Sequence, residues 1–173
     1  MELFYLDIEE YKKKIDKKEL SKYLDIEINH EKRFFEYTLG RYLVKNVAKK
    51  YYEVKDTDIV LNEKGKPVFK EGELHFNISH SKNLLVAGFS KFPTGVDIEY
   101  IKDRNLNKLS KYFKKNFNNL DDFYKFWTLK EAVYKLNHPS DYKFTTKFKN
   151  DFMLSVVSTN DFNLKIIDFK TIL

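Results

Sequence analysis

The stretch LHFNISHSKNLLVAGFSKFPTGVDIEYI, residues 74–101, carries most of the information on the fold. Its first part, 74–79, alternates apolar and polar side chains, as a half-buried strand does. Residues 84–89 are almost continuously apolar, which indicates a more deeply buried strand. The turn residues at 93–95 separate this strand from a third one at 96–101. We therefore expect a β-meander in the middle of the chain.

Helices are expected on either side of the meander. The clearest is predicted for 30–50, where apolar side chains recur at the helical period; they are Phe35, Leu39, Tyr42, Leu43 and Val47. Before it, residues 9–24 have a looser helical pattern and follow an expected first strand at 1–8. After it, a short strand is expected at 58–62.

The C-terminal part of the chain predicts one more helix and a hairpin. A polar stretch at 102–119 precedes a helix at 123–136, with Asp121 or Asp122 as its N-terminal cap. The sequence Asn137-His138-Pro139 is expected to end this helix, because proline cannot continue it. Two apolar runs then predict a closing hairpin, formed by 152–157 and 164–169.

Composition narrows the class of protein. The chain has 173 residues, of which 42% are hydrophobic and 17% aromatic, enough for an ordered core. No apolar run approaches the ~18 residues of a membrane helix, and no signal peptide is evident, so we expect a cytoplasmic protein. Cysteine is absent, which excludes disulfides and thiolate ligands. The net charge of +6 favours acidic or phosphorylated partners.

Two acidic residues share one face of the third strand. Asp97 and Glu99 are two positions apart, so both point away from the apolar side chains of Val96 and Ile98. Neighbouring carboxylates repel each other unless a positive group lies between them, and magnesium favours such oxygen ligands. Two ordinary solvent-facing acids are the commoner explanation of this pattern alone.

The predicted C-terminal helix carries charged residues beside an apolar stripe. Phe123, Phe126, Trp127 and Tyr134 form the stripe. Lys130 falls within it, and an unpartnered lysine there would be costly. Glu131 and Lys135 lie along its edge, four residues apart, a spacing that also suits an ordinary surface ion pair.

Other residues suited to phosphate binding are spread along the chain. Ser79 and His80 end the first strand of the meander, where hydroxyl, imidazole and backbone N–H groups can hold phosphate. Four cations are further candidates, although each alone is more often solvated; they are Lys32, Arg33, Arg41 and Lys66.

The order of these motifs resembles the surfactin-type (Sfp-type) family of 4′-phosphopantetheinyl transferases. The motifs are Gly-Lys-Pro at 65–67, Phe-Asn-Ile-Ser-His-Ser at 76–81, Gly-Val-Asp-Ile-Glu at 95–99 and Trp-x-x-Lys-Glu-Ala-x-x-Lys at 127–135. Residues 32–41 also look like the family's first helix, so the resemblance covers roughly residues 30–136.

The resemblance implies a fold and a reaction. The fold would be α+β, with two similar α/β halves at 1–94 and 95–173 and coenzyme A in the cleft between them. The family's Gly-rich continuation after the last motif is replaced here by 136–140, and the second half is shortened. The reaction would move phosphopantetheine from coenzyme A to a serine of a carrier protein, with magnesium. The expected protein is a monomer that binds neither nucleic acid nor membranes.

The resemblance also implies roles for individual residues. Asp97, Glu99 and Glu131 would hold magnesium, and Glu131, or a water it orients, would act as base toward the carrier serine. Lys135 would stabilise or protonate the leaving phosphate, and Lys130 would contact the phosphates. Ser79 and His80 would hold the nucleotide's 3′-phosphate, with Lys66 and Arg33 as further cofactor-binding residues nearby.

Three other functions remain open at this stage. A metal-dependent nuclease or phosphoesterase could also use an acidic pair, a glutamate and a lysine on a basic protein. A nucleic-acid-binding module is disfavoured, because its charge should gather on one face with aromatic residues. An inactive relative that only binds coenzyme A or a carrier protein is the third.

Overall fold

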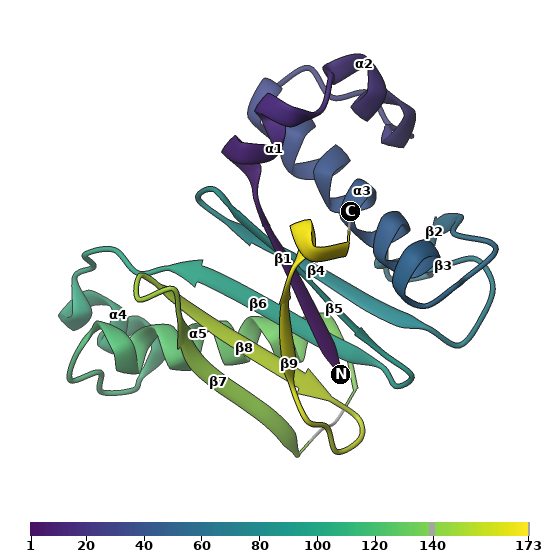
Figure 1. Ribbon diagram of the computed structural model, residues 1–173. Helices are drawn as coiled ribbons and strands as arrows, with labels where there is room; N and C mark the ends of the chain where they lie inside the picture. The colour runs from purple at the N-terminus through teal and green to yellow at the C-terminus, as the bar shows by residue number, and fades with distance from the viewer. Residues whose placement is uncertain (139–140, 173) are drawn as a thin grey trace.

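The computed structural model describes residues 1–138 and 141–172, which form a mixed α+β fold (Figure 1). The N-terminal elements are β1 (Glu2–Asp7), α1 (Ile8–Lys14), α2 (Lys17–Leu20), the 3₁₀ turn η1 (Ser21–Tyr23), α3 (Glu31–Tyr51), β2 (Ile59–Leu61) and β3 (Pro67–Phe69). The central strands are β4 (His75–Ser81), β5 (Leu84–Ser90) and β6 (Thr94–Tyr100). The C-terminal elements are α4 (Leu106–Phe113), α5 (Leu120–Leu136), β7 (Tyr142–Phe148), β8 (Phe152–Ser158), β9 (Lys165–Asp168) and the 3₁₀ turn η2 (Phe169–Ile172).

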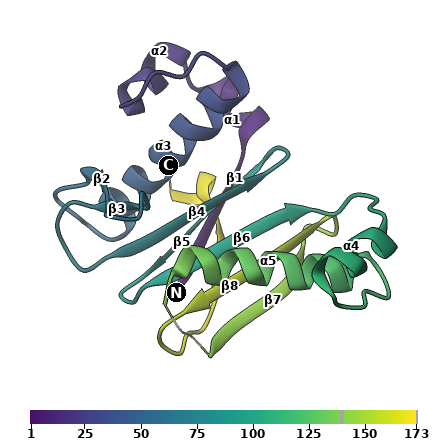
Figure 2. The same ribbon diagram turned by 180° about the vertical axis from the view of Figure 1, so that it is seen from behind.

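Two main sheets make up the body of the molecule. One has the strand order β4-β5-β1-β9, in which β9 is parallel to β1 and the other pairs are antiparallel. The other has the antiparallel order β6-β8-β7, and β2 and β3 form a separate small hairpin. Seen from behind, α5 lies across the β6-β8-β7 sheet, whereas α3 lies near β4 and β5 (Figure 2). Each main sheet therefore has its own long helix.

The helix α3 packs on its sheet through an apolar stripe, as the sequence predicts. Phe35, Leu39, Leu43 and Val47 are buried in one large cluster with residues of β1 and β5. Burial of this stripe is the main stabilising contribution of the helix. The helix begins after His30, whose ring nitrogen accepts a hydrogen bond from a backbone N–H of the first turn.

The helix α5 lies unusually close to its sheet because of one glycine. A Cβ added at Gly95 would lie 2.0 Å from the carbonyl oxygen of Ala132 and 2.7 Å from the backbone nitrogen of Leu136. Only glycine allows the backbones of β6 and α5 to approach this closely. The close approach carries the last turn of α5, with Lys135, over the start of β6.

The two main sheets meet where β4 runs beside β6, and side chains join them. The side chains of Asn77, Ser79 and Ser81 accept hydrogen bonds from the backbone N–H groups of Val96, Ile98 and Tyr100 in turn. These alternate N–H groups are the ones that β6 does not direct toward β8. The polar half of the β4 pattern therefore pairs with the edge of β6 and brings the two central motifs together.

Two strand-pairing predictions are wrong. The expected meander ends after β5, because β6 pairs with β8 in the other sheet. The expected closing hairpin of 152–157 with 164–169 does not form, since β8 is the central strand between β6 and β7 and β9 pairs with β1. Alternation and apolar content locate a strand, but its partners depend on long-range packing.

Smaller differences concern helix ends. Asn119, and neither Asp121 nor Asp122, caps α5: its side chain accepts a hydrogen bond from the backbone N–H of Asp122. At the other end Asn137 adopts the left-handed conformation of a C-cap, as expected for a helix that stops there. The prediction for Pro139 lies outside the described residues. The helix α4 was not expected within 102–119, because that stretch is rich in lysine and asparagine.

The α+β class is confirmed, while the similarity of the two halves, their boundary at 94/95 and the shortening of the second half stay predictions. The strand β9 of the second predicted half pairs with β1 of the first, so both halves contribute strands to one sheet. Among the described residues, none of the helices has the length and apolar character needed to span a lipid bilayer.

Candidate active site

The candidate site lies at the junction of β4, β6 and α5, and Asp97 is at its centre. The side chain of Asp97 is buried, and its Oδ1 lies 2.7 Å from Nζ of Lys135 and accepts a hydrogen bond from Ser79 at 2.9 Å. Its Oδ2 is also buried and has no hydrogen-bond partner among the described residues. Burial raises the pKa of this carboxyl, while Lys135 and Ser79 oppose the rise.

Glu99 lies two residues further along the same face of β6. Its Oε2 accepts a hydrogen bond from Ser81 at 2.9 Å, and its Oε1 accepts one from the indole N–H of Trp127 at 3.4 Å. Residues of β4 and α5 therefore orient this carboxylate from two sides. The same-face prediction for the acidic pair is confirmed by the alternation of their partners Ser79 and Ser81 along β4.

Lys135 connects the three elements of the site. Its Nζ donates to Oδ1 of Asp97, to the Ser79 hydroxyl at 2.9 Å and to the carbonyl oxygen of Val96 at 3.2 Å. Asp97 therefore already has a positive partner in this structure. A lysine held by three acceptors loses little further entropy when an anionic group binds nearby.

Glu131 and Lys130 lie one turn before Lys135 on α5. Glu131 is partly buried, and the described residues include no group of three or more His, Asp or Glu side chains placed to hold a metal ion. Its place beside Asp97 and Glu99 in a metal site stays a prediction.

The stripe argument for Lys130 is wrong. Lys130 is exposed, with Nζ 5.1 Å from the ring centre of Phe113, and Tyr134 is 80% exposed. Of the predicted stripe only Phe123 belongs to the buried face of α5, which comprises Phe123, Tyr124, Thr128, Ala132 and Leu136. Lys130 therefore carries no burial cost, and its phosphate contact rests on the resemblance alone.

Ser79 and His80 point to opposite sides of β4. The Ser79 hydroxyl is buried, donates to Asp97 and accepts from Lys135 and the Ile98 N–H, so its hydrogen-bonding capacity is fully used. His80 faces α3 instead, where its Nδ1 lies 3.4 Å from a carboxylate oxygen of Glu36. Burial lowers the pKa of His80, and the charge of Glu36 opposes this.

Lys66 lies at the edge of the site and holds two backbone segments. Its Nζ donates to the carbonyl oxygens of Thr94, at 2.9 Å, and of Lys135, at 3.0 Å. Burial, with the charge of Lys135, lowers the pKa of Lys66 to about 8. Lys66 and Lys135 both line a cavity of about 470 Å³, together with His75, Asn77 and Tyr134.

The remaining predicted cations lie on α3, and within the described part of the chain none of them forms an ion pair with the acidic residues of β6. Arg33 is exposed on the first turn of α3, and Lys32 lies 3.6 Å from Glu36. Arg41 is buried and paired with Asp25 at 2.8 Å, which accounts for its charge without a ligand.

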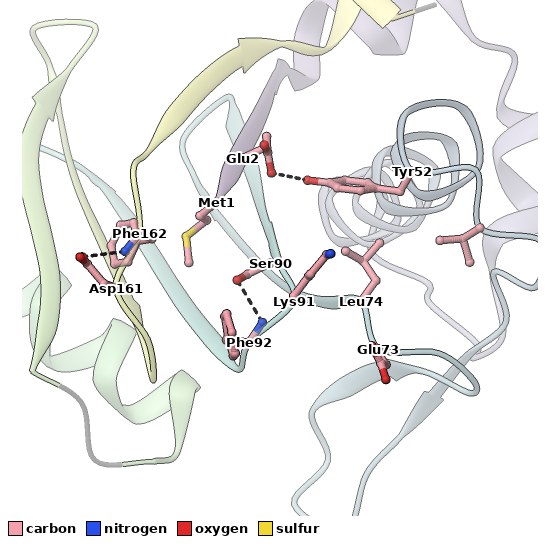
Figure 3. Close-up of a pocket in the computed structure, with 11 residues that line it drawn as sticks. Met1, Glu2, Tyr52, Glu73, Leu74, Ser90, Lys91, Phe92, Asp161 and Phe162 are labelled. Atoms are coloured by element: carbon pink, nitrogen blue, oxygen red, sulfur yellow. Dashed lines mark hydrogen bonds between the residues drawn. The ribbon is translucent and has the colours of Figure 1, made fainter.

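A second cavity, of about 460 Å³, lies beside the N-terminus and contains none of the predicted site residues (Figure 3). Its wall includes Tyr52, whose hydroxyl donates to Glu2 at 2.6 Å, together with Phe92 and Phe162. Of the predicted site residues, Lys66 and Lys135 line the 470 Å³ cavity, and none lines this second one.

No protein-family model matches the chain. It is 34% identical over 136 residues to the 4′-phosphopantetheinyl transferase ffp of Bacillus subtilis and 32% identical over 136 residues to Sfp of Bacillus subtilis strain 168. Each match covers 68% of this chain and 60% of the relative. A third, gsp of Aneurinibacillus migulanus, is 30% identical over 109 residues, with 56% and 46% coverage.

The chain is thus similar in sequence to several Sfp-type 4′-phosphopantetheinyl transferases. This confirms the resemblance drawn from the order of the sequence motifs. The chain matches about 60% of the length of the first two of these transferases, so what the whole enzymes do is carried to it below as a proposal.

Some residues that build the candidate site were not predicted. Ser81 and Trp127 orient Glu99, Asn77 joins β4 to β6, and Glu36 contacts His80. For Asn77 and Ser81 the signal was present, because both share the two-residue alternation of Ser79. No local signal in the sequence could have paired Glu36 with His80, since 44 positions separate them.

The acidic pair fits a magnesium ion. Asp97 offers a buried oxygen without a hydrogen bond, and Glu99 supplies a second carboxylate on the same face of β6. Magnesium usually takes one or two protein carboxylates and completes its shell with water and substrate phosphates. Two carboxylates are therefore sufficient here, whether or not Glu131 contributes.

Proposed function

We propose that this chain transfers the 4′-phosphopantetheine group of coenzyme A to a serine of an apo acyl or peptidyl carrier protein, releasing adenosine 3′,5′-bisphosphate. One observation carries the proposal. In a relative of the Sfp-type transferases, Asp97 and Lys135 form a buried pair beside Glu99, at the junction of the two main sheets. Such a cluster suits a reaction in which both the transferred and the leaving groups are phosphates.

Asp97 and Glu99, with Glu131 as the proposed third ligand, would hold Mg²⁺ beside the pyrophosphate of coenzyme A. The bound ion would neutralise charge that develops on the transferring and leaving oxygens. The partner-free oxygen of Asp97 and the orientation of Glu99 by Ser81 and Trp127 support this assignment.

The residues of α5 would handle the proton and the leaving group. Glu131, directly or through a water, would accept the proton of the carrier serine, whose oxygen forms the new bond to phosphorus. As the pyrophosphate P–O bond breaks, Lys135 would neutralise or protonate the leaving phosphate. Lys130, exposed one turn away from Tyr134, would contact the phosphates from the solvent side.

The nucleotide end of coenzyme A would lie in the 470 Å³ cavity and along β4. Lys66 and His80 are the proposed contacts to the nucleotide, with Arg33 nearby, and Ser79 would act by fixing Asp97 and Lys135. The cavity lies between the Gly-Lys-Pro turn, β4 and the end of α5, which agrees with binding between two halves.

The partner would be an acidic carrier protein, complementary to the net charge of +6. A monomeric, cytoplasmic enzyme that uses neither nucleic acid nor membranes belongs to the same proposal. A panel of apo-carrier proteins would identify the carrier protein.

The decisive experiment incubates the purified chain with coenzyme A, Mg²⁺ and a panel of apo-carrier proteins, and then determines the mass of each carrier. A mass gain equal to one phosphopantetheine group on the serine supports the proposal. Binding of coenzyme A without any mass gain would indicate an inactive relative. Degradation of DNA without reaction on coenzyme A would indicate a metal-dependent nuclease instead.

A further inference from the structure

A histidine and a carboxylate form a pair between β4 and α3, outside the magnesium site. Nδ1 of His80 lies 3.4 Å from Oε1 of Glu36, and the Glu36 side chain is only 15% exposed, against 43% for His80. The pair is fixed by its neighbours, because Ile78, on the same face of β4, packs against α3 at Gly40, one turn after Glu36. His80 therefore presents its free edge outward while Glu36 stays beneath it.

This geometry determines which groups His80 can recognise. When Nδ1 carries its proton toward Glu36, Nε2 of the neutral ring has a lone pair and accepts a hydrogen bond. A ligand hydroxyl can donate to that lone pair, whereas an ionised phosphate oxygen has no proton to donate. Burial lowers the pKa of His80, which favours the neutral ring.

The charges around His80 act in both directions. Glu36 is shared with Lys32, whose Nζ lies 3.6 Å from the same oxygen, and Lys32 is 67% exposed. Lys135 and Glu99 also act on His80 electrostatically, with opposite signs. A phosphate bound at His80 would still approach the partly buried carboxylate of Glu36, and like charges repel. A carboxylate at this position is therefore unfavourable for a phosphate-selective contact.

We propose that Glu36 is a specificity-determining residue that lowers the preference of this site for a 3′-phosphorylated nucleotide. The inference rests on the proposed function, in which the nucleotide end of coenzyme A reaches His80. Its consequence is that the chain accepts dephospho-coenzyme A, which ends in a 3′-hydroxyl, about as well as coenzyme A. Glu36→Gln keeps the shape of the side chain and removes only the charge, so it should restore the preference for the phosphate.

The experiment measures dissociation constants of both ligands by calorimetry at pH 7.5 with Mg²⁺. For the wild type we expect values within about threefold of each other, since the opposite charges of Lys32 and Glu36 nearly balance beside His80. For Glu36→Gln we expect the ratio to shift about tenfold toward coenzyme A, which corresponds to one charge removed at close range. An unchanged ratio in Glu36→Gln would overturn the inference, as would a wild type that already binds coenzyme A a hundredfold more tightly.

Two controls separate this effect from a general change of charge or stability. Glu31→Gln removes the same charge from an exposed position on α3 and should leave the ratio unchanged. In the double variant Glu36→Gln/His80→Ala the gain should become smaller, because the part that acts through the imidazole is lost and only the relief of direct repulsion remains. If the double variant keeps the full gain, Glu36 does not act through His80 and the inference fails. If the wild type binds neither coenzyme A nor dephospho-coenzyme A, the proposed function is contradicted. If the ratio of the two dissociation constants changes equally in all variants, only the role of Glu36 is contradicted.

Discussion

The two long helices cover their sheets in different ways. The helix α3 buries aromatic and aliphatic side chains in one large apolar cluster. The helix α5 divides its contacts between two smaller clusters, with Phe123 and Tyr124 in one and Ala132 and Leu136 in the other. A hydrogen bond joins Thr128 to Ser155 of β8, and Glu131 and Lys135 lie on the flank of the helix. The first helix thus mainly stabilises the fold, while the second is placed so that charged groups reach β6. Loss of the charged side chains on α5 should therefore impair activity first, and loss of the large apolar side chains of α3 should impair stability first.

The largest effect is expected for Asp97→Ala, which removes the central carboxylate of the α5 side. Transfer should fall by about a thousandfold or more, because a metal ligand and the partner of Lys135 are lost together. Mg²⁺ should raise the melting temperature of the wild type and have no effect on the variant. Transfer is measured by the mass of the carrier, with the exposed Asp103→Ala as a control of equal charge. A fully active Asp97→Ala protein would end the proposed metal assignment.

The next largest effect is on stability and compares two glycines, one under each helix. Gly95→Ala would place a methyl group against backbone atoms of Ala132 and Leu136, so α5 must move away, at a cost of about 2–3 kcal/mol. Gly40→Ala in α3 meets only side-chain atoms, none closer than 3.6 Å, and should stabilise the helix by about 0.5–1 kcal/mol. Urea unfolding of both variants measures the difference. Equal destabilisation by the two would show that α5 does not depend on this close approach.

A smaller effect concerns pH and Lys66, which joins the start of β6 to the end of α5. Its pKa is lowered from 10.5 to about 8, so the folded state binds fewer protons than the unfolded state between these values. Stability from this group should therefore rise with pH across the window, by about 1–3 kcal/mol in total. Unfolding free energies of wild type and Lys66→Met, measured from pH 7.5 to 10, give the difference. Parallel curves for the two proteins would contradict the lowered pKa.

The sequence predicted local structure and the central cluster of the site well. The helical stripe of α3 and the alternation of β4 are set by neighbours in the chain, and both formed as expected. The resemblance placed Asp97 and Lys135 in one site with separate roles, and their direct contact at 2.7 Å was not predicted.

What the sequence missed depends on contacts between distant segments. The alternation of β6 cannot reveal that its partner is β8 and not β5, because either pairing buries Val96 and Ile98. The apolar pattern puts Lys130 in a stripe that runs from Phe123 to Tyr134, but Lys130 and Tyr134 are both exposed to solvent. The side of α5 that faces its sheet is set by contacts with Gly95 and its neighbours in space, which the apolar periodicity of this helix does not encode.

The smallest effect expected is that of salt on the carrier partner. The chain carries a net charge of +6, so electrostatic attraction of an acidic carrier protein would raise the rate at which the two proteins meet. Charges on the surface are screened beyond ~10 Å at 0.1 M salt. Coenzyme A would instead meet the partly buried Lys66 and Lys135, whose fields salt weakens less.

Added salt should accordingly raise the KM for the carrier several-fold, with a smaller rise for coenzyme A and little change in kcat. Both constants are measured over roughly a decade of salt concentration, which shortens the Debye length about threefold. A KM for the carrier that stays flat while the KM for coenzyme A rises would reverse the comparison. Docking of the carrier would then depend mainly on apolar contacts. The exposed cations, including Lys32 and Arg33 on α3, would bind coenzyme A instead of the carrier.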